Sequence, residues 1–174
     1  MINKKQIFQI VYAIALIGAI IACIGFLASM IELFQLRGVW IRNLGTLDDE
    51  FGPMCKNYQN ALICGAVAVV VTLFNVFFGK KLGRWMSLVN CVVLLVAIVV
   101  FFILTLNVQS EFLIETKGHT YPEFESLAFS LVSAFRASAM SMVAYLTVLF
   151  GCNVIDVICY KKEKIKTDSE IESV

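Results

Sequence analysis

Four side-chain amides lie inside long apolar stretches of the sequence: Gln9, Asn75, Asn90 and Asn153. In lipid an amide prefers a partner on a neighbouring helix, and such a hydrogen bond contributes about 0.6–2 kcal/mol. Two interpretations are open. The amides form a polar site or part of a water-lined path, or they hold helices together, which is the more common use of such groups. In either case we expect one polar intramembrane layer with one amide from each helix.

Two charged residues mark edges of these stretches. Glu32 ends the first stretch and Arg136 precedes the last. Ionisable groups at such positions either pair with one another or extend towards headgroups and water. One interpretation is an ion pair between Glu32 and Arg136 that joins the first and last helices, and separate contacts with headgroups are the other. Asp156 has a similar place at the opposite edge, where Lys5 or Lys80 could pair with it.

Two of the six cysteines, Cys55 and Cys64, lie nine positions apart on what we predict to be the outer side of the membrane. Disulfides form in oxidising compartments. A Cys55–Cys64 disulfide and a pair of thiols are therefore both open.

Signatures of catalysis are missing. The sequence has no H-E-x-x-H, G-x-S-x-G, P-loop or dinucleotide-binding pattern, and His119 is its only histidine. We therefore expect no catalytic residue, no cofactor and no metal site. The net charge of +1 gives no basic field for nucleic acid.

The composition indicates the class of protein to which these residues belong. Hydrophobic residues make up 60% of the chain and charged residues 16%, with a mean hydropathy of +0.85. Average soluble domains have about 45–50% and about 25% respectively. Four stretches carry no charge: 7–31, 61–78, 85–110 and 137–155.

A helix of about 20 residues crosses about 30 Å of hydrocarbon, and backbone groups in lipid need partners within their own segment. The sequence therefore predicts an all-α membrane protein, a four-transmembrane-helix antiparallel bundle. The expected spans are about 7–34, 60–79, 84–108 and 130–160, followed by a polar tail, 161–174.

Basic residues predict the orientation. Nine lie on the side of the termini (Lys4, Lys5, Lys80, Lys81, Arg84, Lys161, Lys162, Lys164 and Lys166) and four on the other (Arg37, Arg42, Lys56 and Lys117). The excess favours a cell-membrane protein with both termini cytoplasmic. The amide layer would then lie in the inner leaflet, and Trp40 and Tyr58 would mark the outer interface.

The segments between the spans give weaker signals. The first outer loop, 37–60, contains Gly45, Gly52 and Pro53, which predict turns and a short β-hairpin. Thr120 and Glu123 have the spacing of a capping box, which predicts that the fourth helix begins near Tyr121.

Small residues recur along two of the helices. They are Ser126, Ser130, Ala134 and Ser138 in the last, and Ala15, Gly18, Ala19 and Ala22 in the first. Such faces allow close approach, either to another helix of the bundle or to a partner protein.

In layout the chain resembles the tetraspan group that includes claudins: four spans, Trp40 and the cysteine pair in the first outer loop, and a short basic turn after the second span. The resemblance is one of architecture, because the G-L-W-x-x-C pattern of claudins is absent. It implies an adhesion, barrier or channel-accessory role.

From these features we expect a non-catalytic membrane protein that acts through helix and outer-loop contacts with a membrane-protein partner or with copies of itself. The alternative is a subunit of an oligomeric channel or transporter that uses the amide layer. The lipid bilayer is the expected environment in both cases.

Overall fold

The structure, a computed structural model, describes residues 4–44, 48–82, 84–116 and 122–171, and the side chains of residues 6–35, 55–79, 85–107 and 130–158. The described residues form four α-helices, namely α1 (Lys4–Leu44), α2 (Asp48–Leu82), α3 (Arg84–Thr116) and α4 (Pro122–Ile171). The all-helical prediction is confirmed for this part of the chain.

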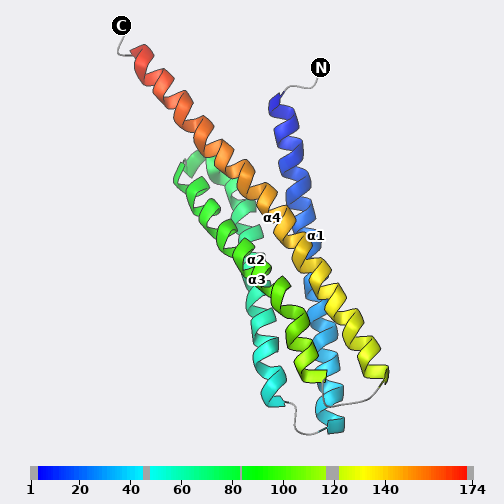
Figure 1. Cartoon of the computed structure of the whole chain (residues 1–174). Coiled ribbons are helices and arrows are strands. Elements are labelled where there is room, and N and C mark those ends of the chain that lie inside the picture. Colours follow the sequence, from blue (N-terminus) through cyan, green and yellow to red (C-terminus); the bar gives the residue numbers. More distant parts are fainter. Residues whose placement is uncertain (1–3, 45–47, 83, 117–121, 172–174) are drawn as a thin grey trace.

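The helices form an antiparallel bundle (Figure 1). Each helix packs against its neighbours in sequence, and α4 packs against α1, so that α2 and α4 are diagonal to one another. Because the helices alternate in direction, α1 begins and α4 ends at the same end of the bundle (Figure 1).

The surface of the bundle is apolar. Each helix is long and apolar enough to cross a membrane, over Gln6–Gln35, Cys55–Gly79, Trp85–Asn107 and Ser130–Ile158. Large apolar side chains such as Ile21 and Val92 are each 63% exposed. A water-soluble bundle would direct such residues inward, whereas lipid is a good solvent for them. The fold is that of a multi-pass membrane protein.

Helix continues where loops and a tail were predicted. Residues 37–44 belong to α1 and residues 48–60 to α2, so the predicted β-hairpin is wrong for the described part of this segment. Likewise α4 includes residues 161–171 of the predicted polar tail. The physical reason is that nucleation is the costly step of helix formation, so a helix begun in the membrane extends more easily into the residues that flank it. Pro53 is the sixth residue of α2 and has no N–H to donate to the carbonyl four residues earlier, so α2 lacks one hydrogen bond near its start.

The last helix begins at Pro122, close to the predicted start, although Thr120 of the capping box lies outside the described residues. With 50 residues, α4 is about 75 Å long at 1.5 Å per residue. Its C-terminal part extends beyond the other helices (Figure 1).

Small residues bring α1 and α4 together. Ala15, Ala19 and Ala22 are buried. At Gly18 a side chain would overlap the ring of Tyr145 from α4. The small-residue face of α1 therefore serves contact within the bundle, the first of the two uses considered for it.

Candidate functional site

Asn153 of α4 is the centre of a polar layer that crosses the bundle. Its Oδ1 accepts hydrogen bonds from Asn75 Nδ2 of α2 at 2.9 Å and from Asn90 Nδ2 of α3 at 3.1 Å. Its Nδ2 donates to the carbonyl of Leu149 in the preceding turn at 2.8 Å. The bond to Asn75 spans the diagonal of the bundle. One side chain therefore connects three helices.

A buried threonine completes the layer on the α2–α3 side. The hydroxyl of Thr72 lies 3.0 Å from Asn90 Oδ1, to which it can donate, and 2.7 Å from the carbonyl of Ala68. Thr72 and Asn90 are fully buried, and Asn153 is 1% exposed. This half of the layer satisfies its polar groups with partners inside the protein, as buried polar groups require.

Tyr12, and not Gln9, is the residue of α1 that reaches the layer. The Tyr12 hydroxyl interacts with the side chains of Asn153 and Asn75. Gln9 is exposed and, with Gln6, Ile10 and Ala13, lines a hollow of about 460 Å³ on the surface, which we term the Gln9 recess. Three of the four predicted amides therefore lie together, and the fourth lies outside their hydrogen-bonded group.

The polar layer is not fully satisfied at Asn75 of α2. Asn75 is half-buried, and its Oδ1 is buried without a hydrogen-bond partner among the described side chains. The same atom lies next to Gly79, where an added Cβ would approach it to 2.8 Å. An unsatisfied acceptor of this kind costs free energy unless a donor reaches it.

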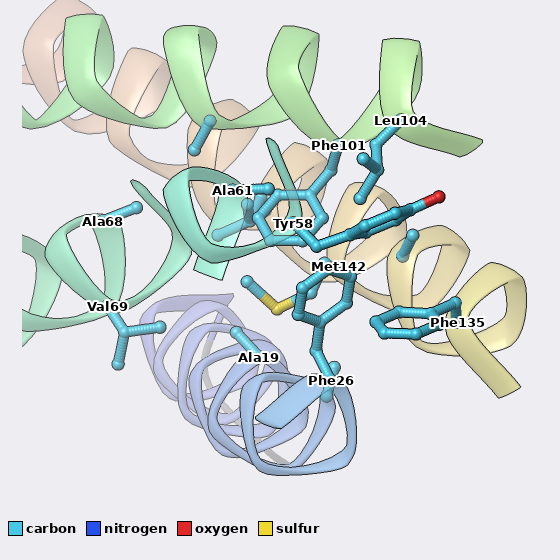
Figure 2. Packing of buried hydrophobic residues seen from close by; sticks show 14 of the residues in the cluster. Ala19, Phe26, Tyr58, Ala61, Ala68, Val69, Phe101, Leu104, Phe135 and Met142 are labelled. Atoms are coloured by element: carbon cyan, nitrogen blue, oxygen red, sulfur yellow. The ribbon is translucent and has the colours of Figure 1, made fainter. Parts of the chain in front are cut away.

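A second layer consists of aromatic rings, one from each helix. Phe26 of α1 packs against Tyr58, Phe101 and Phe135 of the other helices, with ring centroids 6.4, 5.3 and 5.2 Å away. Tyr58 and Phe135 are 4.7 Å apart. Figure 2 shows the rings converging at the centre of the bundle, where all four are fully buried.

The two layers lie towards opposite ends of the spans. Asn90 and Phe101 are 11 residues apart on α3, and Phe135 and Asn153 are 18 apart on α4. At 1.5 Å per residue these separations are about 16 and 27 Å along the helices. Both layers therefore fit within a hydrocarbon region of about 30 Å.

The predicted ion-pair residues lie on the surface of the bundle. Glu32 of α1 and Arg136 of α4 are both exposed. Exposure agrees with either of the two interpretations, so a pair between Glu32 and Arg136 stays a prediction. Asp156 is exposed near the other end of α4.

The structure agrees with the thiol alternative for Cys55 and Cys64. Cys55 and Cys64 both lie in α2, nine residues apart, and the structure holds both as thiols. Nine residues of helix advance about 13 Å. A disulfide requires Cα atoms closer than about 7 Å. Because α2 is continuous through both positions, the bridge cannot form without unwinding the helix.

The arrangement offers little chemistry. Among the described residues, no three histidine, cysteine, aspartate or glutamate side chains gather into a group that could hold a metal ion. The polar layer consists of amides, a threonine and a phenol, which donate and accept hydrogen bonds but supply neither a strong nucleophile nor a carboxylate pair. Its evident capacity is to position helices.

Sequence analysis missed Tyr12, Thr72 and the whole aromatic layer. Tyr12 lies three residues after Gln9. Its polar group is a phenolic hydroxyl and not an amide, so a search for amide side chains does not find it. Tyr58 was expected at the membrane interface, but it is fully buried. A signal existed for the first helix, since Tyr12 and Phe26 are fourteen residues apart, two heptads on one face.

Comparison with known protein families, with curated proteins and with solved structures finds no match to this chain.

Proposed function

We propose that this chain is a non-catalytic four-span membrane protein whose outer surface binds partner membrane proteins or further copies of itself. The observation that carries the proposal is the closed centre of the bundle. Asn90 and Asn153 are 0–1% exposed in the polar layer, and the aromatic rings are fully buried in the other layer. A single bundle closed at two levels offers no passage for a solute, so its function depends on its outer surface.

The exposed side of α4 supports this proposal. Ser133, Ala137 and Ala144 are exposed on it, at spacings of four and seven residues. Small residues on a membrane face allow another helix to approach closely, and serine can donate a hydrogen bond across the contact. Much of the remaining exterior carries bulky residues, such as Ile21 and Val92, which suit lipid chains. Single alanines are also exposed elsewhere, at Ala13, Ala28 and Ala66.

Site-specific photo-crosslinking in native membranes tests the proposal. A photoreactive amino acid at Ala137 of α4 should give a discrete adduct, either of twice the mass of the chain or with one partner. The same group at Ile21 of α1, which is 63% exposed, serves as the matched lipid-facing control and should give no protein adduct. The proposal fails if both positions give the same result.

We also propose that both termini are cytoplasmic. Support comes from the nine basic residues that flank the spans on the side of the termini, against four on the other side. A fluorescent protein that folds only in the cytoplasm, fused after Val174, should fluoresce, and alkaline phosphatase fused there should be inactive. The opposite pair of results would reverse the topology.

Gln9 favours a second candidate function, that of a subunit in an oligomeric channel or transporter. Its amide is exposed within a membrane span, where a polar group seeks a partner or water. A passage would then lie between copies rather than inside one bundle. Solute flux through reconstituted vesicles that is lost in Gln9→Leu would support this function, and absence of flux from a crosslinked oligomer would exclude it.

A further inference from the structure

The polar layer determines which residues lie at one level where α1 begins and α4 ends. Hydrogen bonds hold Asn75, Asn90 and Asn153 together, and Tyr12 interacts with two of them. On each helix the first basic residues come five to nine positions beyond this layer, towards the same end of the bundle. At 1.5 Å per residue they lie about 7–14 Å from the layer. We term these residues the basic belt: Lys4 and Lys5 of α1, Lys80 and Lys81 of α2, Arg84 of α3, and Lys161 and Lys162 of α4.

The basic belt has little negative charge of its own to balance it. From the polar layer out to residue 163 of α4, and over the matching parts of the other helices, the described residues include two acids, Asp156 and Glu163. Like charges held at one level repel one another. The belt therefore favours a surrounding that supplies anions.

The opposite end of the bundle has the reverse charge. Beyond the spans at that end, the described helices carry the basic residues Arg37 and Arg42. Seven acidic residues outnumber them there, namely Asp48, Asp49, Glu50, Glu111, Glu115, Glu123 and Glu125. Only the end with the basic belt is therefore complementary to anions.

An exposed tryptophan indicates the depth of the belt in the membrane. Trp85 directly follows Arg84 and is 79% exposed. Tryptophan is enriched where hydrocarbon meets lipid headgroups. On α2, Phe77 is 73% exposed and precedes Lys80 by less than one turn. Exposed apolar rings therefore adjoin the belt on its hydrocarbon side, which places the belt at the level of the headgroups.

We propose that the basic belt binds the headgroups of anionic phospholipids. Groups of four to eight lysines and arginines next to membrane spans attract anionic lipids. Both residue types form strong hydrogen bonds with phosphate oxygens, because donor and acceptor are charged. The site goes beyond the proposed function, because it does not depend on whether the outer surface binds a partner protein.

Native mass spectrometry of the full chain tests the proposal. The protein is released from detergent micelles that contain equal amounts of phosphatidylglycerol, which is anionic, and phosphatidylcholine, which has no net charge, with the same acyl chains. We expect phosphatidylglycerol to be retained in several-fold excess. Equal retention of the two lipids would overturn the proposal and leave the belt to an acidic segment of a partner protein.

Two matched variants locate the lipid. Combined Lys80→Gln, Lys81→Gln and Arg84→Gln removes three charges of the belt and should lower the excess of phosphatidylglycerol several-fold. Combined Arg37→Gln, Arg42→Gln and Lys56→Gln removes the same number at the other end and should leave the excess unchanged. Equal effects of the two variants would also overturn the proposal. If the belt variant does not fold, the comparison of the two lipids on the wild-type protein decides.

A third arm distinguishes a lipid headgroup from free phosphate. Inorganic phosphate added to the micelles should not displace phosphatidylglycerol, because the acyl chains hold the lipid next to the apolar surface of the bundle. Displacement by phosphate would show that the belt binds a soluble anion and not a phospholipid.

Discussion

Replacement of Asn153 by alanine should destabilise the bundle more than replacement of any other amide. The change removes the acceptor of two interhelical hydrogen bonds, of 2.9 Å from Asn75 and 3.1 Å from Asn90. It also removes the donor to the Leu149 carbonyl, but that bond lies within α4 and holds no second helix.

The magnitude follows from the number of bonds and from what is left behind. Two interhelical bonds at about 0.6–2 kcal/mol each give about 1–4 kcal/mol. Asn90 is fully buried, so its unpaired amide hydrogens cannot reach another acceptor without repacking. Asn75 is only half-buried and can turn outwards. We therefore expect a loss of about 2–3 kcal/mol in the free energy of unfolding for Asn153→Ala, and less for Asn75→Ala.

The assay is equilibrium unfolding in mixed micelles, driven by added sodium dodecyl sulfate and followed by circular dichroism. Gln9→Ala is the matched control and should change the free energy of unfolding by less than about 0.5 kcal/mol, as surface substitutions do. A double-mutant cycle of Asn90→Ala with Asn153→Ala separates the hydrogen bond from the cavity and should give a coupling of about 1–2 kcal/mol. A coupling of zero, or equal effects of the Asn153 and Gln9 substitutions, would refute the reasoning.

Three further predictions use the same unfolding assay or mass spectrometry. Gly18→Ala should cost about 1–3 kcal/mol because the ring of a facing tyrosine must move. Gly151→Ala is the control, because nothing lies within 4 Å of an added Cβ there, and it should be neutral or stabilising. Equal losses of stability in the Gly18 and Gly151 variants would contradict the close packing of Gly18 against α4. Phe26→Leu removes three ring contacts and should cost about 1.5–4 kcal/mol. Phe77→Leu is the control, because its side chain is 73% exposed, and it should change stability little. A loss of stability as large as that of Phe26→Leu would show that the aromatic layer does not stabilise the bundle. Both cysteines of α2 should react with iodoacetamide after denaturation without reductant, and a peptide linked by a disulfide would disprove the continuous helix.

The helical bundle was predictable because membrane spans follow from a simple physical condition. Lipid excludes charge and unpaired backbone groups over about 30 Å, so a charge-free stretch such as 85–110 specifies a helix almost by itself. The same condition does not apply outside the membrane. There, residues 161–171 are polar enough for a loop and also good enough helix formers to continue α4. Residues 37–44 continue α1 although Gly38 and Val39 have low helix propensity.

The polar layer was only partly predictable, because the sequence gives the depth of an amide more reliably than its direction. Asn75, Asn90 and Asn153 have similar distances from the ends of their spans, and they do meet. Gln9 has a similar depth but projects from another side of α1, three residues and about 60° from Tyr12. Which side of α1 faces the bundle depends on packing that also involves aromatic residues, and a search restricted to amides contains no information about it.

Lipid explains why both layers are needed. An apolar side chain gains little when it moves from lipid into the bundle, so apolar burial alone does not determine how far one helix is shifted along another. Between the layers each helix contributes a fully buried alanine, which allows close approach but offers a smooth surface; these are Ala19, Ala68, Ala97 and Ala139. A shift of one helix by a single turn, about 5.4 Å, would break hydrogen bonds in one layer and ring contacts in the other at the same time. Directional contacts near both ends of the spans therefore give the four helices a single register. A bundle with one register presents a fixed exterior, which is the property that a surface for binding other membrane proteins requires.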